Sequence, residues 1–372
     1  MQKNWNSLGL MSGTSGDGVD ASIIRTNGLN QYESIKDKYY EYDTDIYKDI
    51  HNLKDKIHKI EDLKTYKREI DNLERRITLF HAGVIKDLKI HDDTLVGFHG
   101  QTIYHSPEEK ISRQLGNGKL LNQLVNKNVV FDFRANDILH GGQGAPLTPI
   151  FHNLISYQSK IKLPVCFLNI GGISNITIIT GKSDFNNLIS KDIGPGNCLI
   201  DNWIRKNSNK KFDHNGLIAL SGKRNEIIFE QAQELYMNRN NKKKITYDTN
   251  DFDISFLRGL NFEDGVTTLT DFTASIIGEE LSLSLKNLKY KVQDILLCGG
   301  GRKNKVLIEK IKKNLLSNIN LKLIDEFKVD GDYIESQAFA FLAVRSILQL
   351  PISFPSTTRC KEPCTGGKII KI

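Results

Sequence analysis

A run of small and polar residues, GTSGDG at 13–18, stands near the start of the chain between two apolar stretches. Small residues in a turn let the backbone approach an anion closely and point several N–H groups at it. The hydroxyls of Thr14 and Ser15 would add donors, and the Asp17 carboxylate could reach a magnesium ion. The same residue types also form ordinary hairpin turns, so this run alone leaves a phosphate site and a plain turn both open.

Two further glycine-rich turns follow apolar strands later in the chain. LNIGGISNIT (168–177) has the composition of a second phosphate-facing turn, and GGGRKN (299–304) would let a flat ligand such as an adenine ring come close. Neither the P-loop pattern nor a G-x-G-x-x-G after a strand occurs. Each turn has an ordinary structural explanation, but three in this order favour a nucleotide site.

Polar residues that could act on a second substrate follow other predicted strands. Asp192 precedes a rigid Gly-Pro-Gly turn, which suits either a general base or a capping aspartate. A second group gathers in GFHGQTIYH (97–105) and FDFRANDILHGGQGAP (131–146), at positions that line clefts in α/β folds. Within it, Arg134 is suited to a bidentate grip on a carboxylate.

The elements that must position these residues read as α/β. A strand–turn–strand pattern occurs at 8–26 and again at 165–180, which fits a fold built from two related halves. Charged segments with apolar residues at helical spacing predict helices within 47–90, 271–289 and 335–348. Short strands are expected at 95–100, 129–134 and 294–298. A length of 372 residues suits two domains.

Composition narrows the class of protein. The formal charge is +7, but lysines and acidic residues are interspersed along the chain and no aromatic-basic motif accompanies them, which argues against nucleic acid as a partner. No stretch is long and apolar enough for a transmembrane helix, and MQKNWNSLGL is unlike a signal peptide, so we expect a cytoplasmic protein. Five cysteines without C-x-x-C spacing predict neither a disulfide framework nor a zinc site.

With these pieces assembled, the chain resembles the anhydro-N-acetylmuramic acid kinases over nearly its whole length. The resemblance rests on GLMSGTSGDGVDA (9–21), GFHGQTIYH (97–105), FDFRANDILHGGQGAPLTPIFH (131–152), NIGGISNIT (169–177), DIGPGNCLIDNW (192–203), CGGGRKN (298–304), ESQAFAFLA (335–343) and a late FPSTT. It implies an actin-like fold of two RNase-H-like domains, spanning 1–146 plus 346–372 and 147–345. Nucleotide and sugar would bind in a cleft between them.

The resemblance also assigns roles to residues. It implies Asp192 as the general base that takes a proton from the attacking water. We further expect Asp17 to bind the magnesium ion and Arg134 to pair with the sugar's lactyl carboxylate. The implied ATP contacts are Gly13, Thr14, Ser15, Gly16, Asp17, Gly18, Val19, Asp20, Gly171, Gly172, Ser174, Asn175, Gly299, Gly300, Gly301 and Asn304. The implied sugar contacts are His99, Gln101, Arg134, Asp137, Gln143 and Glu335.

The implied reaction is ATP- and Mg²⁺-dependent: 1,6-anhydro-N-acetylmuramic acid is opened by water and phosphorylated on O6, in peptidoglycan recycling. The family also implies a homodimer. The chain departs from the family pattern at Arg302-Lys303 and in the acidic stretch from Asp248 to Asp253. Two alternatives remain: a kinase of the same fold acting on another sugar, and a non-catalytic ATP-gated switch, which would not need a sugar pocket with a base.

Overall fold

The computed structural model describes residues 3–181, 187–238, 246–247, 249–286, 288–316 and 318–372. The chain divides into two compact units. The first unit comprises residues 1–161, 182–189 and 333–372, and the second comprises 162–181 and 190–332. Among the described residues, no helix has the length and apolar character needed to cross a membrane.

The described part of the first unit is built on a seven-stranded sheet with the order β12-β6-β4-β1-β2-β3, and β5 pairs with β4 outside this path. Strands β1 to β3 form an antiparallel meander, whereas β4 runs parallel to β1 and β6 runs parallel to β4. The strands are β1 (Trp5–Ser12), β2 (Gly18–Thr26), β3 (Tyr32–Glu41), β4 (Leu95–Ser106), β5 (Ile111–Leu115), β6 (Val129–Phe131) and β12 (Lys368–Ile370).

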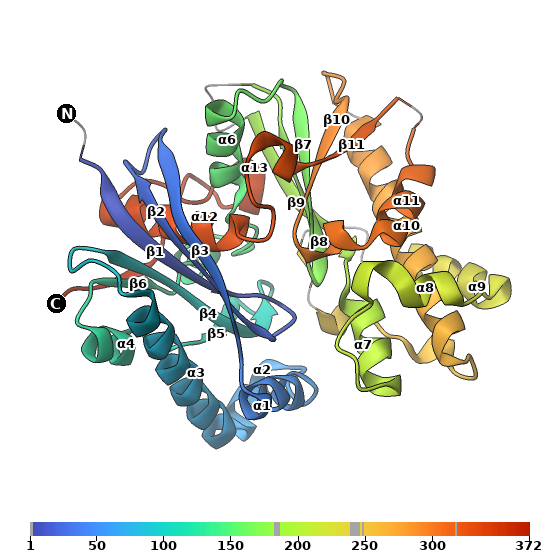
Figure 1. Cartoon of the computed structure of the whole chain (residues 1–372), viewed down its shortest axis with the longest axis horizontal. Helices are drawn as coiled ribbons and strands as arrows, with labels where there is room; N and C mark the ends of the chain where they lie inside the picture. The colour runs from blue at the N-terminus through green and yellow to red at the C-terminus, as the bar shows by residue number, and fades with distance from the viewer. Residues whose placement is uncertain (1–2, 182–186, 239–245, 248, 287, 317) are drawn as a thin grey trace. The chain divides into compact units, whose positions relative to one another are not determined.

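Helices cover both faces of this sheet (Figure 1). They are α1 (Thr44–Lys54), α2 (Ile60–Thr65), α3 (Lys67–Leu88), α4 (Gly118–Val125), α5 (Ala135–Leu139), α6 (Pro149–Gln158), α12 (Ile334–Ile347) and α13 (Pro355–Thr358). Leu8, Leu10 and Phe98 point from the strands into an apolar core that α1 and α3 close. Because side chains alternate along a strand, Gly9 and Gly97 face the opposite side, where they meet the backbone of α12.

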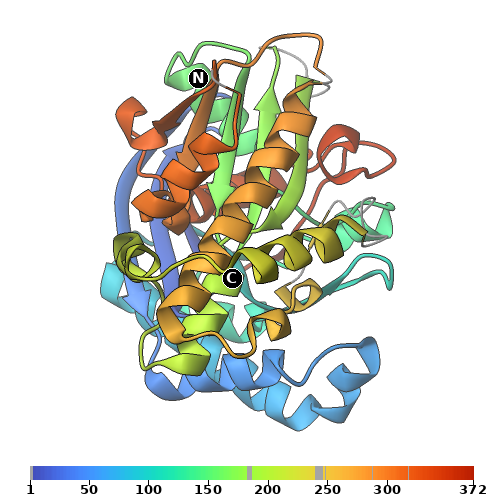
Figure 2. The same cartoon turned by 90° about the vertical axis from the view of Figure 1, so that its right-hand side faces the viewer.

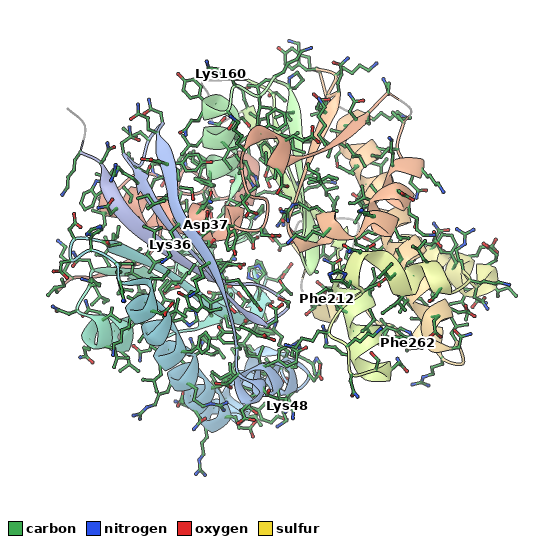
Figure 3. All side chains as sticks on the ribbon, in the orientation of Figure 1. Lys36, Asp37, Lys48, Lys160, Phe212 and Phe262 are labelled. Atoms are coloured by element: carbon green, nitrogen blue, oxygen red, sulfur yellow. The ribbon has the colours of Figure 1, made fainter. Side chains whose placement is uncertain are left out.

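Helix α12 belongs to the first unit through several hydrogen bonds to its strands. Ser7 Oγ donates to the Ala340 carbonyl at 2.8 Å, and the hydroxyls of Ser22 and Ser336 lie 2.6 Å apart. Gln337 Nε2 donates to the carboxylate of Asp37, a β3 residue labelled in Figure 3. The C-terminal segment therefore returns to complete the N-terminal unit.

The second unit repeats this plan with a five-stranded sheet of order β11-β10-β7-β8-β9. Its described elements are β7 (Val165–Ile170), β8 (Ile173–Ile179), β9 (Leu188–Pro195), α7 (Cys198–Asn207), α8 (Leu217–Ser221), α9 (Glu226–Asn238), α10 (Phe262–Lys286), β10 (Asp294–Cys298), α11 (Lys305–Lys313) and β11 (Asn320–Leu323). The long helix α10 crosses the face of the green strands in Figure 2, and its Ala274, Ile277 and Leu281 enter their apolar core.

Both sheets place a hairpin of the first two strands beside parallel strands added on the other side. When β5 is left out and the strands are numbered within each unit, the shared order is 3-2-1-4-5, and β12 is added at one edge of the first sheet. The prediction of a mixed α/β fold with two related halves is therefore confirmed. The expected 129–134 strand ends early, at Phe131, because Asp132 adopts a left-handed backbone with φ of 56°.

The boundaries of the compact units differ from the expected ones. Helix α6 packs with the first unit, where Phe151 meets the ring of Tyr32 edge-on and Gln158 bonds the Tyr32 backbone. Residues 333–345 also join the first unit because α12 packs on β1, β2 and β4. Glu335 consequently stands in the first unit and not in the second.

His81 of α3 provides a test of how burial sets the acid stability of the first unit. Its ring is fully buried, packs 4.8 Å from the Phe98 ring, and has no described hydrogen-bond partner at Nε2. Burial lowers the pKa of His81 to about 4. Below pH 6.5 the imidazole is therefore protonated in the unfolded chain but stays neutral in the folded chain. His81 should therefore cost the wild type about 2 kcal/mol of stability between pH 7 and pH 5.

Replacing His81 by Phe should remove that share of the pH dependence, because phenylalanine fills a similar volume without a titrating nitrogen. Urea unfolding of wild type and His81→Phe at pH 7 and pH 5 measures the difference. His58→Gln, which alters an exposed ring, is the matched control. An unchanged pH dependence in His81→Phe would refute the assignment.

Candidate functional site

The first glycine-rich run forms the turn between β1 and β2, as predicted. The Gly16 N–H donates to the Gly13 carbonyl at 3.1 Å, and Gly16 has a φ of 62° that favours glycine. Ser15 Oγ donates to the Asp17 carboxylate at 2.5 Å. A Cβ on Gly18 would stand 2.4 Å from the Tyr40 carbonyl, so this position has no room for a side chain.

Gln101 holds this turn from the neighbouring strand β4. Its side chain is fully buried, accepts a hydrogen bond from Ser12 Oγ at 2.6 Å, and donates to the Gly13 carbonyl at 3.1 Å. Ser12 Oγ also lies 2.9 Å from the Gly18 carbonyl. The structure thus gives Gln101 a bracing position behind the turn.

Lys54 of α1 also contacts the turn, and sequence reasoning missed it. Its Nζ donates to the Thr14 carbonyl at 2.7 Å, which places a cation beside the candidate phosphate loop. The sequence offers no local signal for this contact, because Lys54 is one of many lysines in a charged helical segment.

Arg134, which follows β6, is hydrogen-bonded to His99 in the interior of β4. His99 Nδ1 lies 2.8 Å from the Gly100 carbonyl and therefore carries the proton, which leaves Nε2 to accept from Arg134 at 2.9 Å. Burial, and then the charge of Arg134, hold the pKa of His99 well below its usual range. A neutral His99 thus orients the guanidinium, whose other arm donates to the Gly144 carbonyl at 2.7 Å.

The remaining sugar candidates occupy different environments in the first unit. Asp137 is buried, and its carboxylate accepts from the Gly144 N–H and the Thr358 hydroxyl, each at 2.6 Å. Gln143 is half-buried and its N–H donates to the Thr358 carbonyl. Glu335 is half-buried at the start of α12. Arg134, Asp137 and Gln143 therefore belong to one hydrogen-bonded segment.

In the second unit, the turn between β7 and β8 is locked to the loop after β9. The N–H groups of Gly196 and Asn197 donate to the carbonyls of Gly172 and Gly171 at 2.9 and 2.8 Å. Ser174 Oγ donates to the Pro195 carbonyl at 3.3 Å. The second glycine turn and the Gly-Pro-Gly loop therefore move as one piece.

Asp192 lies on β9, three residues before Pro195, and is 9 % exposed. Its Oδ2 accepts the Tyr247 N–H at 2.8 Å, which fixes the carboxylate in one orientation. Gly194 follows with a φ of 133°, where a Cβ would stand 2.7 Å from Ile276. The carboxylate therefore stands on strand β9, just before the Gly-Pro-Gly turn that the sequence predicts to hold it.

The third turn, after β10, is packed on one side and open on the other. A Cβ on Gly299 would stand 2.3 Å from Asn169 Oδ1 and one on Gly301 would stand 2.3 Å from Ile170, whereas one on Gly300 would meet nothing within 4 Å. Asn304 caps α11, since its Oδ1 accepts the Leu307 N–H at 3.0 Å. The turn offers backbone at Gly300 for a ligand to approach.

The two basic residues of this turn, Arg302 and Lys303, form ion pairs with aspartates. Arg302 is buried, forms a bidentate pair with Asp325 at 2.9 Å, and also contacts Asp332 and Asp330. Lys303 contacts Asp332 as well. The departure from the family pattern at 302–303 therefore serves a local ion-pair network. In the other departing segment, Asp248 lies outside the described residues.

The two units share one strand order, and each carries a candidate phosphate turn between its first two strands. These features define the class of protein: a two-domain actin-like α/β protein. The sequence matches the family "Anhydro-N-acetylmuramic acid kinase" over residues 6–371. The chain belongs to this family, so it is a phosphotransferase with an alcohol acceptor that uses ATP.

Two curated members of the family agree with this assignment. The anhydro-N-acetylmuramic acid kinase of Pelagibacter ubique is 54% identical over 374 residues, covering 100% of both chains. That of Agrobacterium fabrum is 34% identical over 375 residues, covering 98% of each. A solved structure, component A of Acidaminococcus fermentans (R)-2-hydroxyglutaryl-CoA dehydratase, aligns over 92% of this chain and 99% of its own, with 12% identity and a TM-score of 0.43.

Proposed function

We propose that this chain opens 1,6-anhydro-N-acetylmuramic acid with water and phosphorylates its O6, giving N-acetylmuramic acid 6-phosphate and ADP, in peptidoglycan recycling. The observation that carries the proposal is Asp192, a nearly buried carboxylate of β9. Tyr247 holds it, and the residues that follow β9 are hydrogen-bonded to the second glycine turn. A base fixed beside a candidate phosphate turn is what coupled hydrolysis and phosphoryl transfer require.

In this proposal Asp192 takes a proton from a water molecule while the oxygen of that water bonds to C1 of the sugar. The C1–O6 bond breaks, and O6 then attacks the γ-phosphorus of ATP while the bond to ADP breaks. Backbone N–H groups of 13–18 and 171–175 would hold the phosphates, because glycine lets the anion approach closely. Gly300 would contact the adenosine.

The Asp17 carboxylate at the first turn fits a magnesium ion. Asp17 lies directly before β2 at the end of the glycine turn, and its carboxylate accepts a hydrogen bond from Ser15 Oγ. Magnesium binds through one or two carboxylates together with water and phosphate oxygens. Asp17 would hold it, and it would neutralise charge on the transferred phosphoryl group.

Arg134 would bind the lactyl carboxylate of the sugar. Arg134→Lys should raise the KM for the anhydro sugar about 10- to 100-fold, because lysine cannot reproduce the planar fork that His99 and Gly144 orient. The KM for ATP should stay within about twofold. Initial-rate kinetics with each substrate varied in turn measures both values, with the exposed Arg75→Lys as control. Equal KM values in wild type and Arg134→Lys would exclude this role.

A coupled assay of ADP release with ATP, Mg²⁺ and the anhydro sugar tests the whole proposal. Sugar-dependent turnover, with one 6-phosphorylated sugar formed per ADP, supports it. Turnover only with another amino sugar would favour the alternative kinase, and ATP binding without any sugar-dependent turnover would favour the switch. Because ATP is the donor, we place the reaction in the cytoplasm.

We also infer that the chain acts as a homodimer. Leu217 and Leu220 on α8 and Ile227 on α9 are each more than 60 % exposed, and a second copy of the chain would cover these apolar side chains. Sedimentation equilibrium should give twice the 42.1 kDa chain mass. A single-chain mass at micromolar concentration would refute the dimer.

A further inference from the structure

Two cysteines and an aspartate meet inside the first unit, outside the proposed phosphate turns. Cys360 and Cys364 are 2 % and 4 % exposed, and Asp137 is 1 % exposed. One ligand atom from each, the two Sγ atoms and a carboxylate oxygen, all lie within 4.8 Å of one another. This is the only such group among the described residues. We propose that Asp137, Cys360 and Cys364 bind one zinc-class divalent ion.

The donor set selects this class of ion. Two thiolates with one carboxylate suit zinc and similar borderline-soft ions, whereas magnesium and calcium require mainly oxygen ligands. In a tetrahedral zinc site the ligand atoms lie roughly 3.5 to 3.8 Å apart. The atoms here need only about 1 Å of movement to reach that spacing.

The surroundings hold two of the three ligands, Asp137 and Cys364, in place before any ion binds. Both oxygens of Asp137 already accept hydrogen bonds, from Gly144 N–H and the Thr358 hydroxyl, in the manner of partners that orient a metal-bound carboxylate. Each carboxylate oxygen keeps a second lone pair for an ion. Cys364 is paired with Ser353 through a short antiparallel bridge, which fixes its backbone.

A buried hydroxyl, that of Ser353, could hold a fourth ligand of the ion. Ser353 is fully buried, and its hydroxyl has no conventional hydrogen-bond partner in the described structure. Ser353 is also the residue opposite Cys364 in the antiparallel bridge, so it stands next to the proposed ligands. A water on the ion, bonded to Ser353, would complete a tetrahedron and satisfy this hydroxyl.

The site would tie two distant parts of the chain together. Asp137 lies in α5, directly after Arg134, while both cysteines follow α13 near the C-terminus (Figure 1). The N–H groups of Gln143 and Lys361 already donate to the carbonyls of Thr358 and His140 across this junction. A bound ion would add a covalent-strength link and so stabilise the segment that carries Arg134.

Metal titration of the full chain tests the proposal. Protein stripped with a chelator and kept reduced is titrated with Zn²⁺ against a chromophoric competitor, and with Co²⁺ for spectroscopy. One ion per chain is expected. Cobalt should give a thiolate-to-metal charge-transfer band and the visible bands of a tetrahedral ion. Zn²⁺ should also protect Cys360 and Cys364 of the unaltered chain from alkylation, as read by peptide mass spectrometry.

Variants assign the ligands. Cys360→Ser with Cys364→Ser should lose the charge-transfer band and at least about 100-fold in Zn²⁺ affinity, and Asp137→Asn should keep the band but bind more weakly. Cys198→Ala, which removes a thiol of the second unit, should bind as wild type does. The proposal fails if the unaltered chain binds no stoichiometric zinc, if the double variant binds equally well, or if the two thiols only form a disulfide.

Discussion

Asp192→Asn is expected to lower kcat for sugar-dependent ADP release by about 10²- to 10⁴-fold, the usual contribution of a general base. The amide cannot accept the proton of the attacking water. Its oxygen can still accept the Tyr247 N–H that Asp192 accepts now at 2.8 Å, so the loop should keep its place. Steady-state kinetics at saturating sugar and ATP measures the effect, and the KM for ATP should change little.

The matched control removes a carboxylate of the same unit that lies on another strand, away from the proposed chemistry. Asp294 begins β10, at the end opposite the glycine turn, and pairs with Lys322 at 2.8 Å. Asp294→Asn should keep kcat within about threefold, as expected for a surface ion pair. If Asp192→Asn kept more than a tenth of the wild-type kcat, Asp192 would not be the base.

The local parts of the candidate site were predictable from the sequence. The turns at 13–18, 171–175 and 299–304 are made by neighbouring residues. In the first and third of these turns, glycine at a positive φ or beneath a close contact leaves a direct mark in the sequence. The strand–turn–strand pattern, seen twice, likewise indicated two halves, because each hairpin is a contiguous segment.

Contacts between distant segments were not predictable. The hydrogen bonds of Gln101 to Ser12 and Gly13, 88 or more residues away in the chain, have no signal in the sequence, which predicts Gln101 only as a sugar contact. The aspartates that hold Arg302 follow it by 23 to 30 residues with no motif. The spacing of Cys360 and Cys364 predicted no metal site, since the third ligand lies more than 220 residues earlier.

Gly9→Ala is expected to destabilise the first unit by about 3 to 5 kcal/mol, near the upper end for a single substitution. A Cβ at position 9 would stand 1.8 Å from the Ser336 carbonyl oxygen and 2.6 Å from the Ala340 nitrogen. Both atoms are backbone of α12, so no side chain can rotate away and the helix itself must lift from the sheet. Lifting it would stretch the 2.8 Å bond from Ser7 Oγ to the Ala340 carbonyl.

Urea unfolding can report this unit alone, because the chain has only two tryptophans, Trp5 in the first unit and Trp203 in the second. In a Trp203→Phe background, Trp5 fluorescence follows the first unit. Gly83→Ala is the matched control: a Cβ there meets nothing within 4 Å on an exposed turn of α3, so it should stabilise by about 0.5 to 1 kcal/mol. The same change from glycine to alanine should thus lower the free energy of unfolding at Gly9 and raise it at Gly83. Equal unfolding midpoints for the two variants would show that α12 does not rest on β1 backbone to backbone.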